Sequence, residues 1–443
     1  MKTPHISQIF FKLLCATALL GAVAPVKAAP RLSDYIRPLV GTAGAEGNTF
    51  PGPSAPFGMM QLGPDTDSCL TNWNTCSGYS YDDPTILGFS LTHLSGTGCP
   101  DLVDFLFVPQ VGEPAHVPGD AAHPETGYQS TYSHADESAS AGYYKVKLLK
   151  SGVVADMTAG ERAGIMRFTF PASGGASIMT DLSHIIGPWH IAESRVRIED
   201  NSTITGFHLV NGWAKERYIY LAARYSRPFA GTEIFSSGKP VIYNTYRFRS
   251  PKEAAGRNMQ FLAKYNQKHA GEVIEVKVAI SAVSTADALQ NLDTEIPGWD
   301  FNKVLAATRA KWDQVLGKLQ IEGSRSQKET FHTSLYHASL VPNLFEDVNG
   351  QYRGFDQNVH QSKKFTDYAV FSLWDTFRAE NPWVADHALF TAIKERFDGK
   401  PWRDWPAELG KRDPAAIAKV QAELEPRILQ LIAEQALFDE QWR

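Results

Sequence analysis

A change of hydrophobic period near residue 284 divides this chain into two kinds of structure. Between about 140 and 283, apolar and polar residues alternate, as in the run Tyr144-Lys145-Val146-Lys147-Leu148. The same alternation returns from Ile274 to Ile280. Alternation turns one face of a strand toward a core and the other toward solvent. Several such runs separated by turn residues predict an antiparallel β-sandwich.

After residue 284 the period becomes helical. Apolar residues then share one helical stripe, at Phe301, Val304, Leu305, Thr308, Trp312, Val315, Leu316 and Leu319. A second helix is expected at about 327–340, and Pro342 stops it. We therefore expect a β-rich domain followed by an α-rich one, joined by a helical linker at 284–325.

Length and charge limit the functional classes. A chain of 443 residues has room for two or three domains, each with its own core. A formal net charge of −5 and a pI near 6.2 give no electrostatic footprint for nucleic acid. The 10 Trp, 16 Tyr and 24 Phe would suit a carbohydrate binder. They suit a β-rich core equally well, and core packing is the favoured interpretation for most of them.

The first 29 residues have the pattern of a secretory signal peptide. Lys2 and Lys12 supply positive charge, residues 13–26 are largely apolar, and Val26-Lys27-Ala28 offers a small-residue cleavage site. Cys15 only faintly resembles a lipoprotein acceptor, so cleavage is favoured over lipidation. The apolar run is too short for a comfortable membrane span, and no other segment is apolar enough for one. We expect an exported protein, periplasmic or secreted, without a membrane span.

Three cysteines remain after the signal segment. Cys69 and Cys76 flank a short polar loop and are the candidate disulfide pair for an oxidising compartment. Cys99 would then be the odd thiol, although its pairing with either of the others stays open. Ligand-type residues do not occur at zinc spacing, so no structural zinc is expected.

Residues 30–110 are rich in glycine and proline, which predicts loops and close backbone approach. Within them, Ser95 is followed directly by Gly96, which excludes the nucleophile elbow of a serine hydrolase. Gly96-Thr97-Gly98 lacks both the third glycine of a dinucleotide loop and the lysine of a phosphate loop. For the lone His93, a hydrogen-bonded structural role is favoured over a ligand or base.

A series of ordered motifs resembles glycoside hydrolase family 92, the calcium-dependent exo-acting α-mannosidases. The resemblance covers about 34–382. Its motifs are Val40-Gly41-Thr42, Thr49-Phe50-Pro51-Gly52, Pro56-Phe57-Gly58-Met59, Gly78-Tyr79, Ile86 to Cys99, Ser334-Leu335-Tyr336-His337, Pro342-Asn343-Leu344-Phe345, Tyr352-Arg353-Gly354 and Phe371 to Arg378. It implies an N-terminal β-sandwich at 30–283 packed on an (α/α)6 barrel that starts at 326–382, with the sugar site between them.

The resemblance also implies a chemistry. Two carboxylates hydrolyse the bond with inversion, and calcium helps to hold the terminal mannose. Trp374 and Asp375 inherit a place in the terminal-sugar pocket, with Arg378 and His93 as further substrate-binding candidates. Barrel packing is an equal interpretation for Trp374. The acid, the base and most calcium ligands of the family lie beyond this motif, so no catalytic residue or metal ligand is identifiable, and most of the calcium site is expected to be missing.

From Trp383 the sequence resembles another family. Residues 383–443, with the run Pro401-Trp402-Arg403-Asp404-Trp405-Pro406, resemble an internal piece of 4-α-glucanotransferase, the amylomaltase of glycoside hydrolase family 77. The catalytic residues of that family also lie outside the matching segment. We expect a junction near 380–383 between two truncated parts, and both a real fusion and an assembly artefact stay open.

The leading hypothesis is therefore an exported glycoside hydrolase of the exo-α-mannosidase type, truncated and catalytically incomplete. Its expected partners are α-mannosides or other glycans, with no nucleic acid, and its oligomeric state stays open. One alternative is a 4-α-glucanotransferase, from the C-terminal segment. The other is a non-enzymatic carbohydrate-binding remnant that uses Trp374 and Asp375.

Overall fold

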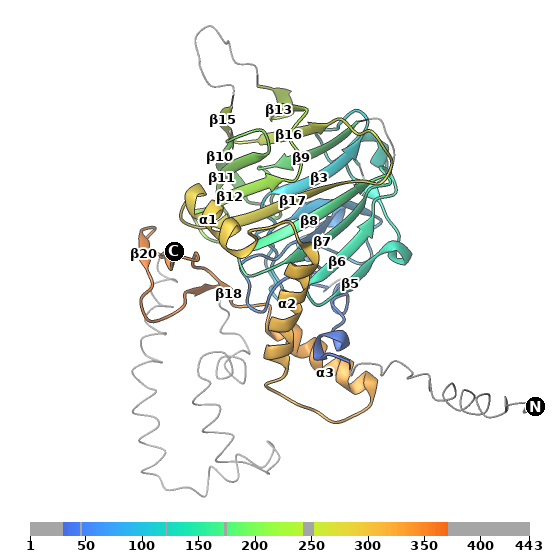
Figure 1. Ribbon diagram of the computed structural model, residues 1–443, viewed down its shortest axis with the longest axis vertical. Helices are drawn as coiled ribbons and strands as arrows, with labels where there is room; N and C mark the ends of the chain where they lie inside the picture. Colours follow the sequence, from blue (N-terminus) through green and yellow to red (C-terminus); the bar gives the residue numbers. More distant parts are fainter. Residues whose placement is uncertain (1–29, 45–46, 121, 172–174, 242–251, 371–443) are drawn as a thin grey trace, which may run out of the picture. The chain divides into compact units, whose positions relative to one another are not determined.

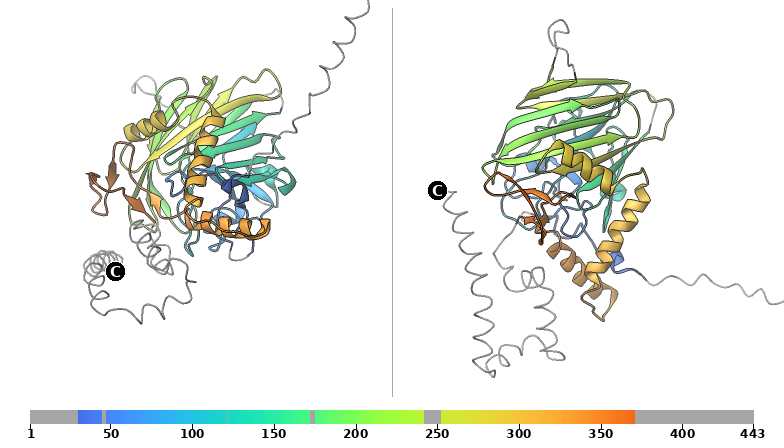
Figure 2. Two further views of the ribbon diagram at one scale, coloured as in Figure 1. Left: turned by 60° about the horizontal axis from the view of Figure 1, so that its bottom comes forward. Right: turned by 60° about the vertical axis from the view of Figure 1, so that its left-hand side comes forward.

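The computed structural model describes residues 30–370, except 45–46, 121, 172–174 and 242–251. Within them, two large antiparallel sheets lie face to face (Figures 1 and 2). The first has the spatial order β1 (Gly63–Thr66), β2 (Thr85–Ser90), β3 (Leu106–Val111), β9 (Ala176–Asp181), β16 (Met259–Tyr265), β13 (Gly231–Ser236) and β14 (Lys239–Pro240), with β4 (Ser130–Thr131) on β2. The second has the order β15 (Glu253–Gly256), β10 (His190–Ile198), β11 (Thr203–Asn211), β12 (Arg217–Tyr225), β17 (Glu272–Ser281), β8 (Ala163–Phe170), β7 (Val154–Ala159), β6 (Tyr143–Lys147) and β5 (Ser138–Ser140). The predicted β-sandwich is confirmed.

The core of the sandwich fills the space between these sheets. Phe89 on β2 and Phe168 on β8 are both fully buried, with ring centroids 6.0 Å apart. Along β6 the predicted alternation holds, because Tyr144 and Val146 are buried while the lysines beside them are exposed. Burying side chains of this size contributes about 1.5–3 kcal/mol each. The alternating pattern therefore identified the core face correctly.

The polar face of β17 differs from the prediction. Alternation placed Lys277 toward solvent, yet its exposed fraction is 2%. Its Nζ donates to the Ile296 carbonyl oxygen at 2.8 Å and lies 4.7 Å from the centre of the Trp299 ring. The face is covered because helix α1 (Thr285–Glu295) packs on β12 and β17. The alternation of apolar and polar residues in a strand cannot predict that a helix from later in the chain covers the outer face of the sheet.

Three helices follow the sandwich in the described residues: α1, α2 (Phe301–Leu316) and α3 (Arg325–Ala338). Each begins at a side chain that caps it, Ser284, Asp300 and Ser324 respectively. A helical region after the sandwich is therefore confirmed, and the second predicted helix begins and ends two residues earlier than expected. Short 3₁₀ turns lie at Leu32–Tyr35, Asp67–Leu70, Pro124–Thr126 and His134–Asp136.

Helix α2 fastens the helices to the sandwich (Figure 1). Thr308 Oγ1 donates to the Ala159 carbonyl oxygen at 2.7 Å, and Trp312 Nε1 donates to the Ser54 carbonyl oxygen at 2.7 Å. Trp312 is fully buried, and its ring lies 4.6 Å from that of Tyr336 on α3. The predicted amphipathic stripe of α2 thus faces both the sandwich and α3.

Two small sheets follow α3. One pairs β18 (Asn343–Leu344) with β21 (Tyr368–Ala369), and the other is a hairpin of β19 (Gln351–Arg353) and β20 (Val359–Gln361). Within 326–370, α3 is the one helix described, so the (α/α)6 barrel stays a prediction. None of the helices among the described residues combines the length and apolar character that crossing a bilayer requires.

Candidate functional site

The sites predicted from the sequence fall in two places. Trp374, Asp375 and Arg378 lie outside the described residues. His93 lies in the loop between β2 and β3 and is fully buried. This loop, residues 91–105, is the part of the described chain where charged groups, strained backbone and exposed tryptophans meet.

His93 bridges two acceptors inside the protein. Its Nδ1 lies 2.6 Å from the Gln61 carbonyl oxygen and its Nε2 lies 2.9 Å from Asp65 Oδ1. Both ring nitrogens therefore lie within hydrogen-bond distance of an oxygen atom. The ring also stacks on Phe50 with centroids 4.8 Å apart. His93 therefore holds β1 to the loop after β2, and its burial does not support the contact with sugar that the resemblance implied.

Asp65 is the charged centre of this cluster. It accepts from both His93 and His184, whose Nε2 lies 2.9 Å from Asp65 Oδ2. Burial acts to raise the pKa of Asp65, but the hydrogen bonds from His184 and His93 outweigh burial and hold that pKa below its ordinary value. A buried carboxylate stays ionised here because its partners are complete.

A second cluster is built around Asp104. This carboxylate accepts from Thr92 Oγ1 at 2.6 Å, His208 Nε2 at 2.7 Å and Arg217 Nη1 at 2.6 Å. His208 Nδ1 lies 2.9 Å from the Leu182 carbonyl oxygen, so the ring links this carboxylate to the backbone just after β9. Burial opposes ionisation, but Arg217 and His208 lower the pKa of Asp104 well below its usual range. The cluster ties the loop to β11 and β12.

The backbone between the two clusters is strained. Leu102, Val103 and Phe105 have φ values of 70°, 54° and 59°. The left-handed region is costly for residues with a Cβ, and most of all for β-branched valine. Val103 and Phe105 are both fully buried, and the Phe105 ring stacks on His208 with centroids 4.3 Å apart. Strain that surrounding contacts maintain is typical of a functional loop.

Three tryptophans from three other loops surround this loop, and we call Trp73, Trp189 and Trp213 the tryptophan rim. Trp73 Nε1 donates to the Gly98 carbonyl oxygen at 3.1 Å, and Trp189 Nε1 donates to the Pro100 carbonyl oxygen at 2.6 Å. The backbone N–H of Trp213 donates to Asp101 Oδ2 at 2.9 Å. Trp73 is 49% exposed and Trp213 is 38% exposed. Exposed indole rings on fixed loops can bind the apolar face of a sugar.

Sequence reasoning missed the rim because it assigned most tryptophans to the core. A local signal does exist. Trp73 lies between Asn72 and Asn74, Trp189 follows Gly187-Pro188, and Trp213 follows Asn211-Gly212. Such turn residues predict loop tips and not buried strands. The close approach of Asp101 also favours glycine at position 212, because a Cβ there would lie 3.0 Å from Asp101 Oδ2.

The disulfide predicted between Cys69 and Cys76 is not formed in the structure. Cys69, Cys76 and Cys99 are all free thiols. Cys69 is packed in an apolar cluster, and Cys76 Sγ donates to the Trp73 carbonyl oxygen at 3.2 Å. Burial raises the pKa of both thiols. In this structure the two cysteines therefore stabilise the Trp73 loop by packing and hydrogen bonding, and not by a disulfide.

A hollow of about 440 Å³ beside the β7–β8 turn is lined by two carboxylates, those of Glu161 and Glu295. Glycosidases need such a pair. Glu295 Oε2, however, accepts from the backbone N–H groups of Arg162 and Ala163 at 2.9 and 3.1 Å. Glu161 pairs with Lys311 at 2.6 Å. These contacts fasten the turn to the helices, so the pair is structural.

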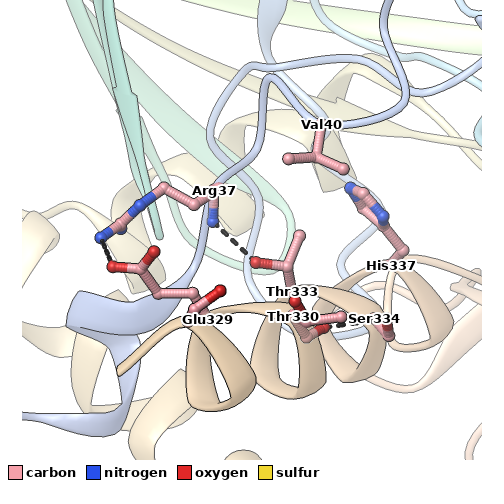
Figure 3. Close-up of a pocket in the computed structure, with 8 residues that line it drawn as sticks. Arg37, Val40, Glu329, Thr330, Thr333, Ser334 and His337 are labelled. Atoms are coloured by element: carbon pink, nitrogen blue, oxygen red, sulfur yellow. Dashed lines mark hydrogen bonds and ion pairs between the residues drawn. The ribbon is translucent and has the colours of Figure 1, made fainter. Parts of the chain in front are cut away.

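Figure 3 shows a second hollow, of about 230 Å³, between the N-terminal segment and α3. Arg37 pairs there with Glu329 at 2.5 Å, and its backbone N–H donates to Thr333 Oγ1 at 3.0 Å. Burial lowers the pKa of His337 to about 4, so this ring is neutral at pH 7. Glu329 is the one carboxylate among the lining residues, and the hollow therefore lacks an acid/base pair.

Comparison with known families decides what the chain is. A family model described as the glycosyl hydrolase family 92 N-terminal domain matches residues 35–281. The chain belongs to glycosyl hydrolase family 92. A model of the family 92 catalytic domain matches residues 287–388, past the junction expected near 380–383.

Individual relatives agree with this assignment. A family 92 α-mannosidase from Bacteroides thetaiotaomicron, solved with mannoimidazole, is 48% identical with a TM-score of 0.76, covering 80% of this chain and 46% of that chain. An uncharacterized secreted glycosidase from Arthroderma benhamiae is 27% identical over 382 residues, which are 80% of this chain and 46% of that protein. The chain spans about half the length of these relatives.

The second resemblance covers a short part of the chain. A 4-alpha-glucanotransferase from Aquifex aeolicus is 36% identical over 81 residues, which are 18% of this chain and 16% of that enzyme. This family 92 chain therefore also shares a short segment with an enzyme of different activity.

Proposed function

We propose that this family 92 protein acts on α-mannosides as an exo-acting glycoside hydrolase that inverts the configuration of the sugar. The observation that carries the proposal is the 48% identity with an α-mannosidase solved with mannoimidazole. In this proposal Trp374, Asp375 and Arg378 contact the terminal mannose. The tryptophan rim supports the same function, because exposed indole rings on a braced loop can bind the apolar face of a sugar.

Inverting hydrolysis needs one carboxylic acid to protonate the leaving oxygen and one carboxylate to activate water. Neither hollow described above offers such a pair, so we assign neither role to a residue. The contribution proposed for the described residues is to bind and orient the glycan.

Membership of family 92 suggests dependence on calcium. Calcium takes six to eight oxygen ligands, several of them carboxylates. The described ranges contain no group of three or more His, Cys, Asp or Glu side chains placed to hold a metal ion. Asp65 and Asp104 instead have N–H and O–H donors as neighbours. The described residues do not fit the ion, and no step here depends on it.

Domain limits and export belong to the same proposal. We place the sandwich domain at 30–283, the linker at 284–325, the start of the catalytic domain at 326–382 and the glucanotransferase-like segment at 383–443. The segment before residue 30 would be a cleaved signal peptide. The relative from Arthroderma benhamiae, described as secreted, supports export.

Calorimetry with methyl α-mannoside, together with an assay of mannose released from α-linked mannobiose, tests this function. Asp375→Asn is expected to weaken binding at least tenfold, because a carboxylate that accepts sugar hydroxyls is lost. Asp136→Asn, at an exposed position in the sandwich, is expected to leave binding unchanged. Identical heats for wild type and Asp375→Asn would reject this site.

The assay also separates the alternatives. Binding without release of mannose would favour the carbohydrate-binding remnant. The segment shared with 4-alpha-glucanotransferase supports a transferase instead. Disproportionation of maltotriose by the purified chain would establish the transferase activity. We expect no disproportionation.

A further inference from the structure

The two loops that carry Cys76 and Cys99 are joined by hydrogen bonds close to both cysteines. Trp73 Nε1 donates to the carbonyl oxygen of Gly98, the residue before Cys99, at 3.1 Å. The carbonyl oxygen of Trp73 accepts from Cys76 Sγ at 3.2 Å. One tryptophan residue thus links Cys76 to the backbone next to Cys99.

A second connection between the two loops runs through Asn48 and Thr49. Asn48 Nδ2 donates at 2.9 Å to the carbonyl oxygen of Thr97, which lies two residues before one of the cysteines. Ser77 Oγ donates at 3.3 Å to the Thr49 carbonyl oxygen, and Ser77 directly follows Cys76. Residues beside each cysteine therefore bind adjacent residues of one segment, which brings the two cysteines close together.

The two thiols also lie within electrostatic reach of each other. Burial raises the pKa of Cys76, and the negative charge of an ionised Cys99 raises that pKa further. Charges act strongly on each other only at short distance. Cys69 differs, because its side chain is packed in an apolar cluster, and the charges that add to the effect of burial on its pKa are aspartates, Asp65 first among them. Cys99 is therefore the better partner for Cys76.

We propose that Cys76 and Cys99 are a redox site, and that under oxidising conditions they form a disulfide that fixes the Trp73 loop to the loop at residues 91–105. Both cysteines are thiols in the structure, which therefore represents the reduced state. Cys99 is partly exposed and accessible to an oxidant, whereas Cys76 is 2% exposed. The bridge needs no sugar, so this inference does not rest on the proposed function.

The reaction is a thiol–disulfide exchange with a small-molecule disulfide, for which we choose oxidised glutathione. Cys99 loses its proton, and its thiolate attacks one sulfur of the oxidant, whose other half leaves as a thiolate and takes up a proton. Cys76 then loses its proton and attacks Cys99 Sγ, and the second half of the oxidant leaves in the same way. Two protein thiols are oxidised to a disulfide, and one disulfide is reduced to two thiols. Since burial raises the pKa of both cysteines, the exchange should become faster as the pH rises.

Peptide mapping of the full chain after incubation with oxidised or reduced glutathione tests this site. The protease must be chymotrypsin, because the chain has no Lys or Arg between Arg37 and Lys145, whereas cleavage after Trp73 separates Cys69 from Cys76. The oxidised chain is expected to yield a peptide in which Cys76 is joined to Cys99, with the loss of two hydrogens by mass, while Cys69 remains a free thiol.

Thermal unfolding gives a second measurement. The melting temperature of the oxidised chain should lie about 5–10 °C above that of the reduced chain, because the bridge restricts the unfolded chain between residues 76 and 99. Cys99→Ser should abolish this shift. Cys69→Ser is the matched control and should keep it. Each variant is compared with itself under the two conditions, so a general loss of stability does not obscure the result.

The peptide map also shows which outcomes contradict the inference. A bond between Cys69 and Cys76 would assign the bridge to the other pair of cysteines. Three free thiols after oxidation would show that the two loops hold Cys76 and Cys99 too far apart. A bond between two chains would make Cys99 a site of dimerisation. Each of these results would overturn the inference.

Discussion

The body of the sandwich and the loop at residues 91–105 are stabilised by different interactions. In the body, fully buried apolar residues such as Phe168 and Ile274 face the opposite sheet. In the loop, Asp104 is equally buried but pairs with Arg217 and His208. Apolar packing depends on volume, whereas a buried ion pair depends on every partner being present and correctly protonated. The difference teaches that the stability of one domain can rest on apolar packing in its body and on complete ion pairs in one of its loops.

The largest expected effect comes from removing one member of the charged cluster. Asp104→Ala leaves His208 without its carboxylate and Arg217 with only the longer pair to Asp101, and should lower the free energy of unfolding by about 3–5 kcal/mol. It should also release the loop to which Trp213 is bonded, so mannoside binding should be lost. Urea unfolding followed by tryptophan fluorescence measures the first effect, and calorimetry measures the second.

Phe168→Ala is the matched variant in the body. It should also cost about 3–5 kcal/mol through the cavity it leaves, but the protein that stays folded should bind mannoside normally. Equal loss of mannoside binding in Phe168→Ala and Asp104→Ala would contradict a special role of the loop in binding.

A change of pH should have a smaller effect on stability, and its direction should differ between two pH ranges. Asp65 and Asp104 have pKa values below the ordinary one in the folded state. An unfolded aspartate takes up its proton near pH 4, so the unfolded chain binds more protons and stability falls as the pH falls below about 4. Burial raises the pKa of Asp347 to about 6. Its protonation in the folded state should therefore raise stability as the pH falls from about 7 to about 4.

Thermal unfolding between pH 3 and pH 8 should accordingly show a maximum at mildly acidic pH. Asp347→Asn should reduce the rise between pH 7 and pH 4 without abolishing it, because burial also raises the pKa of Asp367 to about 6, and should leave the fall below pH 4. A steady decline of the wild type from pH 7 downward would contradict the assignment of Asp347.

The smallest expected effect on stability belongs to the rim. Trp213→Ala should change the free energy of unfolding by no more than about 0.5 kcal/mol, since the side chain is 38% exposed and its backbone bond to Asp101 remains. Mannotriose binding should weaken about three- to tenfold. Trp299→Ala is the control, because Trp299 is 37% exposed but lies over Lys277. Similar binding losses in both variants would show that the rim has no special role.

Much of the fold was predictable from local patterns. The alternation at β6 and β17 and the helical stripe of α2 each predicted the right element. The caps Ser284, Asp300 and Ser324 were not predicted and came from the structure. The prediction failed at Lys277, because the helix that covers it comes later in the chain. It also left His93 between two roles, because burial is a property of the whole fold.

The candidate site was less predictable. Trp73, Trp189 and Trp213 lie in three separate loops, and no local period relates them. Turn residues beside each tryptophan could have placed it on a surface, but not next to the other two. The family motifs found from the sequence nevertheless pointed to the correct family, since the family 92 models match the same part of the chain.

The sequence by itself therefore determined the strands, the helices and the family, because these depend on residues close together in the chain. Only the tertiary structure decided which carboxylates become buried ion pairs. Asp104 and Arg217 are separated by 113 positions and Asp65 and His184 by 119. Their pairing follows from the order of strands in the two sheets, which brings distant loops to one end of the sandwich. The tryptophan rim exists for the same physical reason.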